Sequence, residues 1–222
     1  MTRASMNTSA SDCAPTRRGA LARLAAPVAA VAMPWLATGR AAEAATPRLT
    51  PAQTEGPFYP VDLPVDTDFD LLRQGGTEYL RGQPAWLDGS VLDPAGRPVK
   101  GAVVEIWQCD FDGHYRHPRD GNRADPRFQA FGRVAVDADG RYRFRTMRPV
   151  AYTGRTPHIH VKVLLAKRTL LTTQLYVEGD PGNERDGLWR SLRDPLDRAA
   201  LTVPFSASAD GLRAQFPIVV AA

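Results

Sequence analysis

The sequence predicts an all-β fold, a β-sandwich with long connecting loops and little helix. The 222 residues include 19 prolines and 18 glycines, which favour short segments separated by turns. After about residue 82, most apolar residues fall into short alternating or β-branched runs. Such runs are typical of strands packed in two layers. We therefore expect a single domain with one hydrophobic core.

The first segment, residues 1–45, is expected to be an export signal peptide. The paired Arg17 and Arg18 precede an alanine-rich apolar run and a cleavage point among small residues near Ala42 to Ala45. A weakly apolar run after two arginines is typical of a twin-arginine signal, which predicts export to the periplasm. A disordered tail or a membrane anchor is the alternative. The run is shorter than the roughly 18–20 apolar residues of a spanning helix, so no stable anchor is expected.

Loss of this signal changes the charge and the cysteine content. The chain has a net charge of +4, and residues 1–45 hold five arginines against one aspartate and one glutamate, which is +3. The remaining chain is then near +1, and a nucleic-acid partner is not expected. Because Cys13 leaves with the signal, Cys109 has no intrachain partner, and no disulfide is expected.

The remaining chain divides into an arm and a domain. Residues 46–81 form a proline-rich arm with little regular structure, which includes TEGPFYP at 54–60. Residues 82–222 form the β-sandwich. Strands are expected in AWLDGSVL (85–92), VVEI (103–106), FGRVAV (131–136), YRFRT (142–146), HIHVKVLLA (158–166), TLLTTQLYVEGD (169–180) and AQFPIVV (214–220), a turn at DADG (137–140), and mixed helical character only from Asn183 to Leu201.

The strand after the DADG turn has two different faces. Tyr142, Phe144 and Thr146 alternate with three arginines, at positions 141, 143 and 145. Because alternate side chains point to opposite faces of a strand, we expect an aromatic face toward the core and a solvated arginine face.

Two histidines stand one residue apart in TGRTPHIHVKV (153–163), in a chain that has only four. On a strand, His158 and His160 share one face, and Ile159 points the other way, toward the core. A His-x-His pair on a strand is a recurrent metal-binding pair, and it is equally compatible with two solvated surface histidines. The pair alone leaves both interpretations open.

Two tyrosines help to decide whether the histidines bind a metal or lie on the surface. Tyr115 follows a glycine turn in EIWQCDFDGHYRHP, and Tyr152 lies with Arg155 in a short loop before the histidines. Either tyrosine alone is more typical of a core residue. A phenol loses its proton at about pH 10 in water, so only a strongly Lewis-acidic ion such as ferric iron would hold it ionised at neutral pH. Together with the histidines, the tyrosines indicate a non-haem Fe(III) centre.

On these residues the sequence resembles the intradiol ring-cleavage dioxygenases. It is more similar to the protocatechuate 3,4-dioxygenase-like group than to the catechol 1,2-dioxygenases, which carry an additional helical N-terminal region. The resemblance covers most of residues 50–181, in the family's order. It rests on TPAQTEGPFYP, GSVLDPAGRPVKGAVVEIWQCDFDGHYRHP, DPRFQAFGRVAVDADGRYRFRTMRPVAY, GRTPHIHVKV and LTTQLYVEGDP.

The resemblance implies an oxidoreductase that cleaves a catechol-type ring between its two hydroxyl-bearing carbons and yields a muconate-type diacid. The implied partners are a small aromatic diol and O₂, and the sequence leaves a homo-oligomer open. The implied iron ligands are Tyr115, Tyr152, His158 and His160. The implied catalytic residues are Tyr152, which takes a proton from the diol, and Arg155, which stabilises negative charge, and the positions near the substrate are Gln174, Trp107 and Pro57.

The sequence also departs from the family pattern. Only five residues separate Tyr152 from His158, and Gly154 stands where the better-known enzymes have an aromatic wall. We therefore expect a more open pocket, and the diol cannot be identified from the resemblance. His114 and His117, beside Tyr115, are expected to lie on the surface or behind the ligands.

Two other functions stay open. GSVLDPAGRPVKGAVVEI also resembles the transthyretin-like (prealbumin-like) β-sandwiches, which include exported binding modules without a catalytic metal. A zinc or copper hydrolase or oxidase could use the two strand histidines, but the acidic base or further histidine that it needs is not found nearby. Metal analysis with a visible spectrum separates the three, because tyrosinate bound to Fe(III) is coloured, whereas zinc proteins and empty modules are colourless.

Overall fold

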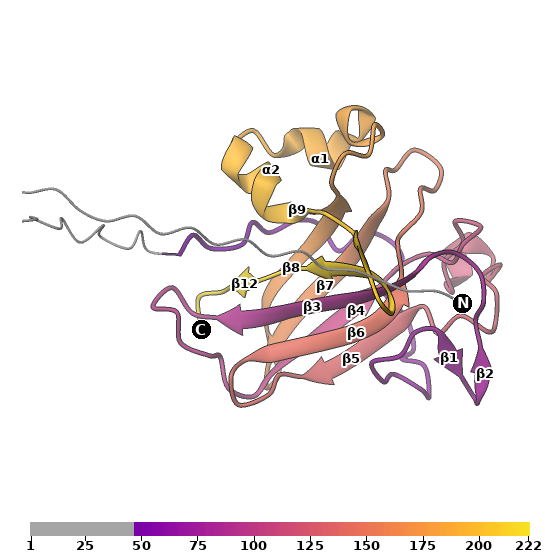
Figure 1. Ribbon diagram of the computed structural model, residues 1–222, viewed down its shortest axis with the longest axis horizontal. Helices are drawn as coiled ribbons and strands as arrows, with labels where there is room; N and C mark the ends of the chain where they lie inside the picture. Colours follow the sequence, from indigo (N-terminus) through magenta and orange to yellow (C-terminus); the bar gives the residue numbers. More distant parts are fainter. Residues whose placement is uncertain (1–46) are drawn as a thin grey trace, which may run out of the picture. The chain divides into compact units, whose positions relative to one another are not determined.

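The computed structural model describes residues 47–222, which form two stacked β-sheets with short helices at one end (Figure 1). The expected export signal, residues 1–45, lies outside the described residues. One sheet contains, in order, β10 (Ser206–Ser208), β11 (Gly211–Gln215), β3 (Pro84–Leu92) and β12 (Ile218–Val219), with β6 (Arg141–Met147) paired to β3. The other contains β5 (Phe131–Ala135), β4 (Ala102–Trp107), β7 (His158–Leu165), β8 (Arg168–Val177) and β9 (Thr202–Val203). The predicted all-β sandwich is confirmed.

The core lies between the two sheets. Leu87 of β3 pairs with Phe144 of β6, and both are fully buried against Ile106 and Ile159 of the second sheet. Burial of such side chains contributes roughly 1.5–3 kcal/mol each. The alternation predicted for β6 is confirmed, because its aromatic side chains face this core.

The other face of β6 carries the arginines, as predicted, and two of the three are paired with carboxylates. Arg143 donates to Asp88, and Arg145 Nη1 donates to Asp70 Oδ2 at 3.0 Å. The predicted solvated face is confirmed for Arg141 and Arg143, which are exposed, whereas the side chain of Arg145 is only one quarter exposed.

The C-terminal run, predicted as one strand over 214–220, is divided in two. β11 and β12 both pair in parallel with β3, and Phe216 and Pro217 separate them. Pro217 has no N–H to give to a sheet, and the N–H of Phe216 donates to the Asp88 carbonyl at 2.8 Å. A Cβ at Gly89 would overlap the Phe216 carbonyl, so only glycine allows this approach.

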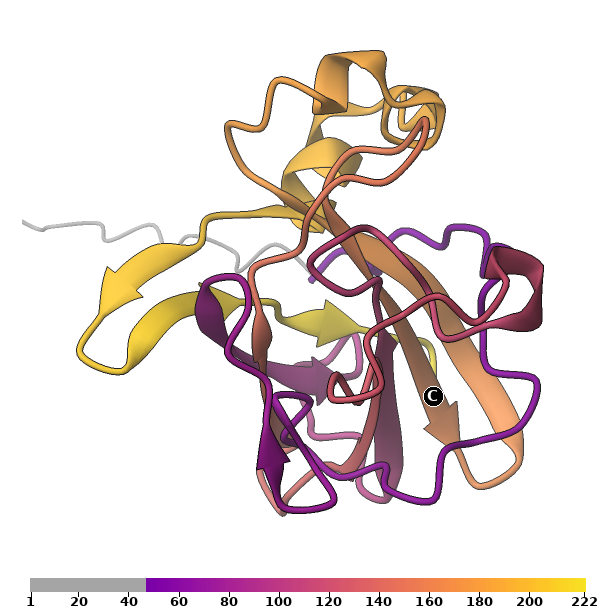
Figure 2. The ribbon, with the colours of Figure 1, turned by 90° about the vertical axis from the view of Figure 1, so that its right-hand side faces the viewer.

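The described part of the arm, residues 47–81, lies against the sandwich (Figure 2, indigo). The N–H of Thr50 donates to the carbonyl of Val219, and the N–H of Gln53 donates to the carbonyl of Thr172, both at 2.9 Å. The arm ends in a hairpin of β1 (Arg73–Gln74) and β2 (Thr77–Glu78). Backbone hydrogen bonds from two different sheets therefore hold it in place.

The helical character predicted for 183–201 appears as three short helices, η2 (Asn183–Arg185), α1 (Gly187–Ser191) and α2 (Pro195–Leu201). A further 3₁₀ helix, η1 (Pro118–Asp120), lies in the loop after β4. Asp186 and Asp194 cap α1 and α2, so each aspartate marks where a new helix begins. None of the helices within residues 47–222 has the length and apolar character needed to span a membrane.

Candidate metal centre

β7 presents His158 and His160 on one face and Ile159 on the other, as predicted. Both imidazoles are buried, with 1% of each residue exposed, and their Nε2 atoms lie 3.2 Å apart. Ile159 is fully buried in the core. The two rings therefore meet at one interior point, and the interpretation as solvated surface histidines is wrong.

The protein does not supply hydrogen-bond partners for all the nitrogen atoms of these two imidazoles. Nδ1 of His158 lies 2.6 Å from the Thr156 carbonyl, and because a carbonyl only accepts, this nitrogen carries the proton and Nε2 keeps a free lone pair. Nδ1 of His160 is buried without a partner, so either tautomer of His160 leaves one nitrogen unsatisfied. Burial, with the charge of Arg155, lowers the pKa of His158 to about 4 and that of His160 well below its usual value. Both rings are neutral at pH 7, the form that binds metals.

Two phenol rings face the histidines. The ring centroid of Tyr152 lies 5.5 Å from that of His158, and the centroid of Tyr115 lies 6.0 Å from that of His160 and 5.3 Å from that of Tyr152. The Tyr115 hydroxyl is buried and has no hydrogen-bond partner. Burial raises the pKa of both phenols, so each keeps its proton unless a nearby cation offsets the loss. The structure thus brings together the four residues predicted as ligands.

The chemistry of this group fits a ferric ion. A buried hydroxyl without a partner and two imidazole nitrogens turned toward each other are polar atoms that a cation would satisfy. Hard phenol oxygens combined with imidazoles suit iron better than a soft metal. Within residues 47–222, no three His, Cys, Asp or Glu side chains gather in a metal-binding group. Two of the side chains that lie against the imidazoles are phenols.

Arg155 is held beside Tyr152. Its N–H donates to the Tyr152 carbonyl at 2.8 Å, its Nε donates to Asp186 Oδ2 at 2.7 Å, and its Nη2 donates to Gln174 Oε1 at 2.6 Å. Gln174 in turn donates from Nε2 to the Thr54 carbonyl of the arm at 3.0 Å. Two side chains, Asp186 and Gln174, therefore hold the guanidinium, and the backbone hydrogen bond keeps Arg155 next to Tyr152.

Asp186 is a residue that sequence analysis missed. Its Oδ1 accepts from the N–H groups of Leu188 and Trp189 at the start of α1, and its Oδ2 accepts from Thr156 N–H and Arg155. Burial raises the pKa of this carboxyl, but the hydrogen bonds outweigh burial and the net shift is downward, so it is ionised. An aspartate just before a helix predicts that it caps the helix. Its contact with Arg155, which lies 31 positions earlier in the chain, leaves no signal in the sequence.

Aromatic walls flank the four rings. Trp107 of β4 stacks on His160 with centroids 4.7 Å apart, and Phe58 of the arm stacks on Tyr115 at 4.5 Å. A Cβ at Gly56 would lie 3.3 Å from His160 Cε1, and Gly56 has a φ of +74°, so glycine lets the arm come this close. The stretch TEGPFYP indicated the arm, but it did not single out Phe58.

The other predicted residues have clear positions. Pro57 is exposed, next to Phe58 in the chain. A Cβ at Gly154 would meet no atom within 4 Å, which fits the open approach predicted there. His114 is half-buried, with Nδ1 3.5 Å from Asp120, and the ring of His117 accepts a hydrogen bond from the N–H of Arg119.

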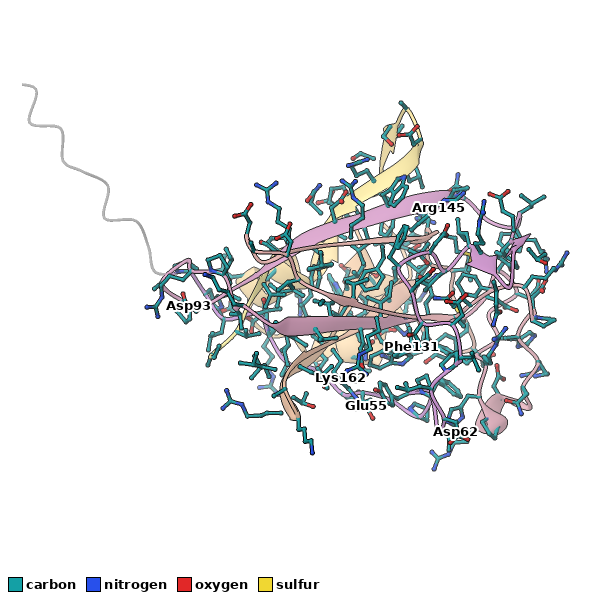
Figure 3. All side chains as sticks on the ribbon, turned by 90° about the horizontal axis from the view of Figure 1, so that it is seen from below. Glu55, Asp62, Asp93, Phe131, Arg145 and Lys162 are labelled. Atoms are coloured by element: carbon teal, nitrogen blue, oxygen red, sulfur yellow. The ribbon has the colours of Figure 1, made fainter. Side chains whose placement is uncertain are left out.

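A group of four residues, which we call the arm latch, was also missed. The Lys162 ammonium pairs with Glu55 and lies 3.4 Å from the centre of the Tyr59 ring, and the Tyr59 hydroxyl donates to Glu105 Oε2 at 2.8 Å. Figure 3 shows Glu55 and Lys162 side by side. The latch holds the arm against the strand that carries both histidines.

Known proteins are similar to this chain in sequence. A sequence profile of the family described as Dioxygenase matches residues 54–222. Hydroxyquinol 1,2-dioxygenase of Rhodococcus opacus is 36% identical over 159 residues, which cover 64% of this chain and 50% of the relative. The protocatechuate 3,4-dioxygenase beta chain of Burkholderia cepacia is 40% identical over 112 residues, which cover 45% of this chain and 47% of the relative. The chain thus spans about half the length of these curated relatives.

A solved structure agrees with these relatives. The dioxygenase domain of a dioxygenase and carbohydrate-binding fusion protein from Streptomyces sp. SirexAA-E is 32% identical, with a TM-score of 0.62, over 78% of this chain and 97% of that one. The sequence profile, the relatives and the shared sheets agree with the resemblance seen in the sequence. The chain belongs to the intradiol ring-cleavage dioxygenase family.

Proposed function

We propose that this protein is a non-haem Fe(III)-dependent intradiol dioxygenase that cleaves a catechol-type ring between its two hydroxyl-bearing carbons with O₂. One observation carries the proposal, the meeting of two phenols and two neutral imidazoles at one buried point. The names of the relatives, which include hydroxyquinol and catechol 1,2-dioxygenases, support this reaction class.

The proposed ligands are Tyr115, Tyr152, His158 and His160. Bound ferric iron would supply a Lewis acid that holds both diol oxygens and makes the ring reactive toward O₂. The role of proton acceptor is proposed for Tyr152 from the family resemblance: its oxygen would be ionised as an iron ligand and would take one proton from the diol. Arg155 keeps its charge at all working pH values, so it stabilises negative charge that develops on the ring and cannot act as the base.

The surrounding residues are proposed to orient the diol and exclude water. Trp107 and Phe58 provide flat apolar surfaces next to the ligand rings, and Gln174 fixes the Arg155 guanidinium. Pro57 is proposed to line the approach to the site, beside Phe58. The open space at Gly154 favours a diol that carries a substituent on this side.

Oxygen uptake by the purified protein tests the proposal. Iron-loaded protein should be coloured and should consume one O₂ for each ring cleaved with at least one of catechol, protocatechuate and hydroxyquinol. A colourless protein with no uptake would favour the transthyretin-like binding module. A colourless zinc protein with hydrolase activity would favour the zinc interpretation.

We also propose that residues 1–45 direct export through the twin-arginine route. The paired Arg17 and Arg18 before a weakly apolar run support this proposal. Replacement of both arginines by lysine should keep the protein in the cytoplasmic fraction, whereas the native chain should appear in the periplasm without its first 45 or so residues. A homo-oligomer stays a prediction, which sedimentation would check.

A further inference from the structure

The arm passes the candidate metal centre between two anchors, and the first of these lies upstream. The N–H of Gln53 donates to the Thr172 carbonyl at 2.9 Å. The Thr54 carbonyl accepts from Gln174 Nε2 at 3.0 Å. Within residues 47–222, no backbone-to-backbone hydrogen bond joins residues 54–66 to either sheet. Side chains must therefore hold the arm where it passes the ligand rings.

The arm latch is the second anchor. Lys162 follows the two histidines on the same face of β7, and Glu105 of β4 lies opposite it in the sheet register. Both are buried, at 8% and 1% exposed, and the arm brings a partner to each. Lys162 pairs with Glu55 (Figure 3), and Glu105 accepts from the Tyr59 hydroxyl at 2.8 Å. Glu105 also lies 3.4 Å from Arg133, whereas Glu55 is the only carboxylate of the described chain that pairs with Lys162.

Tyr59 links the latch to the ligand rings. The Lys162 ammonium lies 3.4 Å from the centre of the Tyr59 ring, and this ring meets Trp107 edge to face with centroids 5.0 Å apart. Trp107 stacks on His160 at 4.7 Å. Phe58, the neighbour of Tyr59 in the chain, stacks on a proposed iron ligand at 4.5 Å. A shift of Tyr59 would therefore move the side chain that covers this ligand.

The latch is built from charges and a hydrogen bond, although apolar side chains could also hold the arm. Replacement of a buried ion pair by well-packed apolar side chains is often neutral for stability. A hydrogen bond and an ion pair instead require particular atoms to meet, so they select one position of the arm along β7. This choice of contacts favours a role in placing the arm.

We propose that Lys162 is a positioning residue that acts through Glu55 and Tyr59 to fix Pro57 and Phe58 at the diol site. This inference rests on the proposed function, in which these two arm residues line the approach and cover the ligand rings. Residues that only cover the diol contact it equally before and during the reaction. A loosened arm should therefore weaken diol binding and leave the chemical step unchanged.

Steady-state kinetics of the iron-loaded full chain with Lys162→Met test this role. Methionine keeps an apolar stem and removes the ammonium, and the Glu55 side chain, already 43% exposed, can turn to water. With whichever of catechol, protocatechuate and hydroxyquinol the wild type cleaves, KM should rise at least about fivefold and kcat should stay within about twofold. A fall in kcat with KM unchanged, or no change in either constant, would overturn the proposal.

Lys167→Met is the matched control. Lys167 is exposed in the turn between β7 and β8, so this variant removes the same charge from the same hairpin without touching the arm latch. Its KM and kcat should equal those of the wild type. A rise in KM as large as that of Lys162→Met would mean that charge alone, and not the position of the arm, sets diol binding.

Chymotrypsin cleavage of the metal-free chain tests the latch without iron or turnover. Phe58 is half-buried, so cleavage after it requires release of the arm, and the rate follows the population of the released arm. Mass spectrometry should show this cut at least about tenfold faster in Lys162→Met and in Glu55→Gln. The double variant should match Lys162→Met, because both changes remove one pair. Lys167→Met should match the wild type.

Glu55→Gln keeps the test decisive if Lys162→Met does not fold. Equal cleavage rates for the wild type and Glu55→Gln, with equal midpoints of urea unfolding, would overturn the proposal. A protein that shows the expected cleavage rates but no ring cleavage would support the latch and refute the proposed function, so the two failures are distinguishable.

Discussion

Two buried tyrosines show how the sandwich core differs from the candidate metal centre. Tyr142, in the core, is 5% exposed and donates its hydroxyl to the Phe216 carbonyl at 2.6 Å. Tyr115, at the metal centre, is 2% exposed, and its hydroxyl has no partner. Burial raises the pKa of both phenols. The core hydroxyl is satisfied by the fold, whereas the hydroxyl at the centre is left for something the chain does not supply.

This difference suggests that the two regions serve different ends. A buried polar atom without a partner costs about 1–3 kcal/mol, so such atoms are rare where only stability matters. Here several of them lie together, on Tyr115, His160 and Trp107. Substitutions in the two regions should therefore affect activity and stability in opposite proportions.

The largest expected effect comes from Tyr115→Phe. Loss of the phenol oxygen should reduce ring cleavage by at least about 10³-fold, more than the loss of a single charge-stabilising donor costs. The metal-free variant should be as stable as the wild type or slightly more so, because an unsatisfied hydroxyl is removed. Oxygen uptake and urea unfolding measure the two effects. A Tyr115→Phe variant that is destabilised but active would contradict the account, because Tyr115 would then behave as a core residue.

Arg155→Ala should come next, with turnover about 10²–10³-fold slower, since a charge aimed at the reacting ring is lost. The iron content should stay at the wild-type level, because Arg155 is not a proposed ligand. Metal analysis with steady-state kinetics checks both points. Turnover at the normal rate would rule out the proposed role of this arginine.

Asp186→Asn should slow turnover about tenfold, the lower end of what an outer partner of a metal site contributes. Asparagine can still cap α1 through Oδ1, but its Nδ2 replaces the oxygen that accepts from Arg155 Nε and from Thr156 N–H, so the contact that holds the guanidinium is lost. Asp194→Asn is the matched control, because this aspartate caps α2 and contacts Arg48 away from the centre. Equal rates for the two variants would show that Asp186 acts only as a cap.

The smallest effect on activity should follow Tyr142→Phe. The variant leaves the Phe216 carbonyl without its hydroxyl donor and should lose about 1–2 kcal/mol of unfolding free energy. Ring cleavage should stay within about twofold of the wild type, because Tyr142 belongs to the inter-sheet core. Chemical denaturation measures the loss of stability, and oxygen uptake measures the rate of ring cleavage. A large loss of turnover here would mean that core and centre are coupled.

Local patterns predicted much of the fold and of the centre. Alternation along 158–160 placed two imidazoles on one face, and the turn signal at 137–140 separated two strands correctly. These features depend on neighbours in sequence, so periodicity and turn chemistry suffice.

Features that depend on distant contacts could not be predicted. The parallel pairing of β11 and β12 with β3 joins segments more than 120 positions apart, and no local pattern encodes it. The Asp186 contact with Arg155 and the arm latch follow from how the loops and the arm close over β7. The divided C-terminal strand could have been foreseen, because Pro217 interrupts the run.

Anomalous diffraction at the iron absorption edge, from crystals of the iron-loaded chain, tests the central claim most directly. We predict a single strong peak within bonding distance, about 2 Å, of the two tyrosine oxygens and the two histidine Nε2 atoms at the candidate centre. A peak bonded to the histidines alone, or located elsewhere in the molecule, would contradict the account.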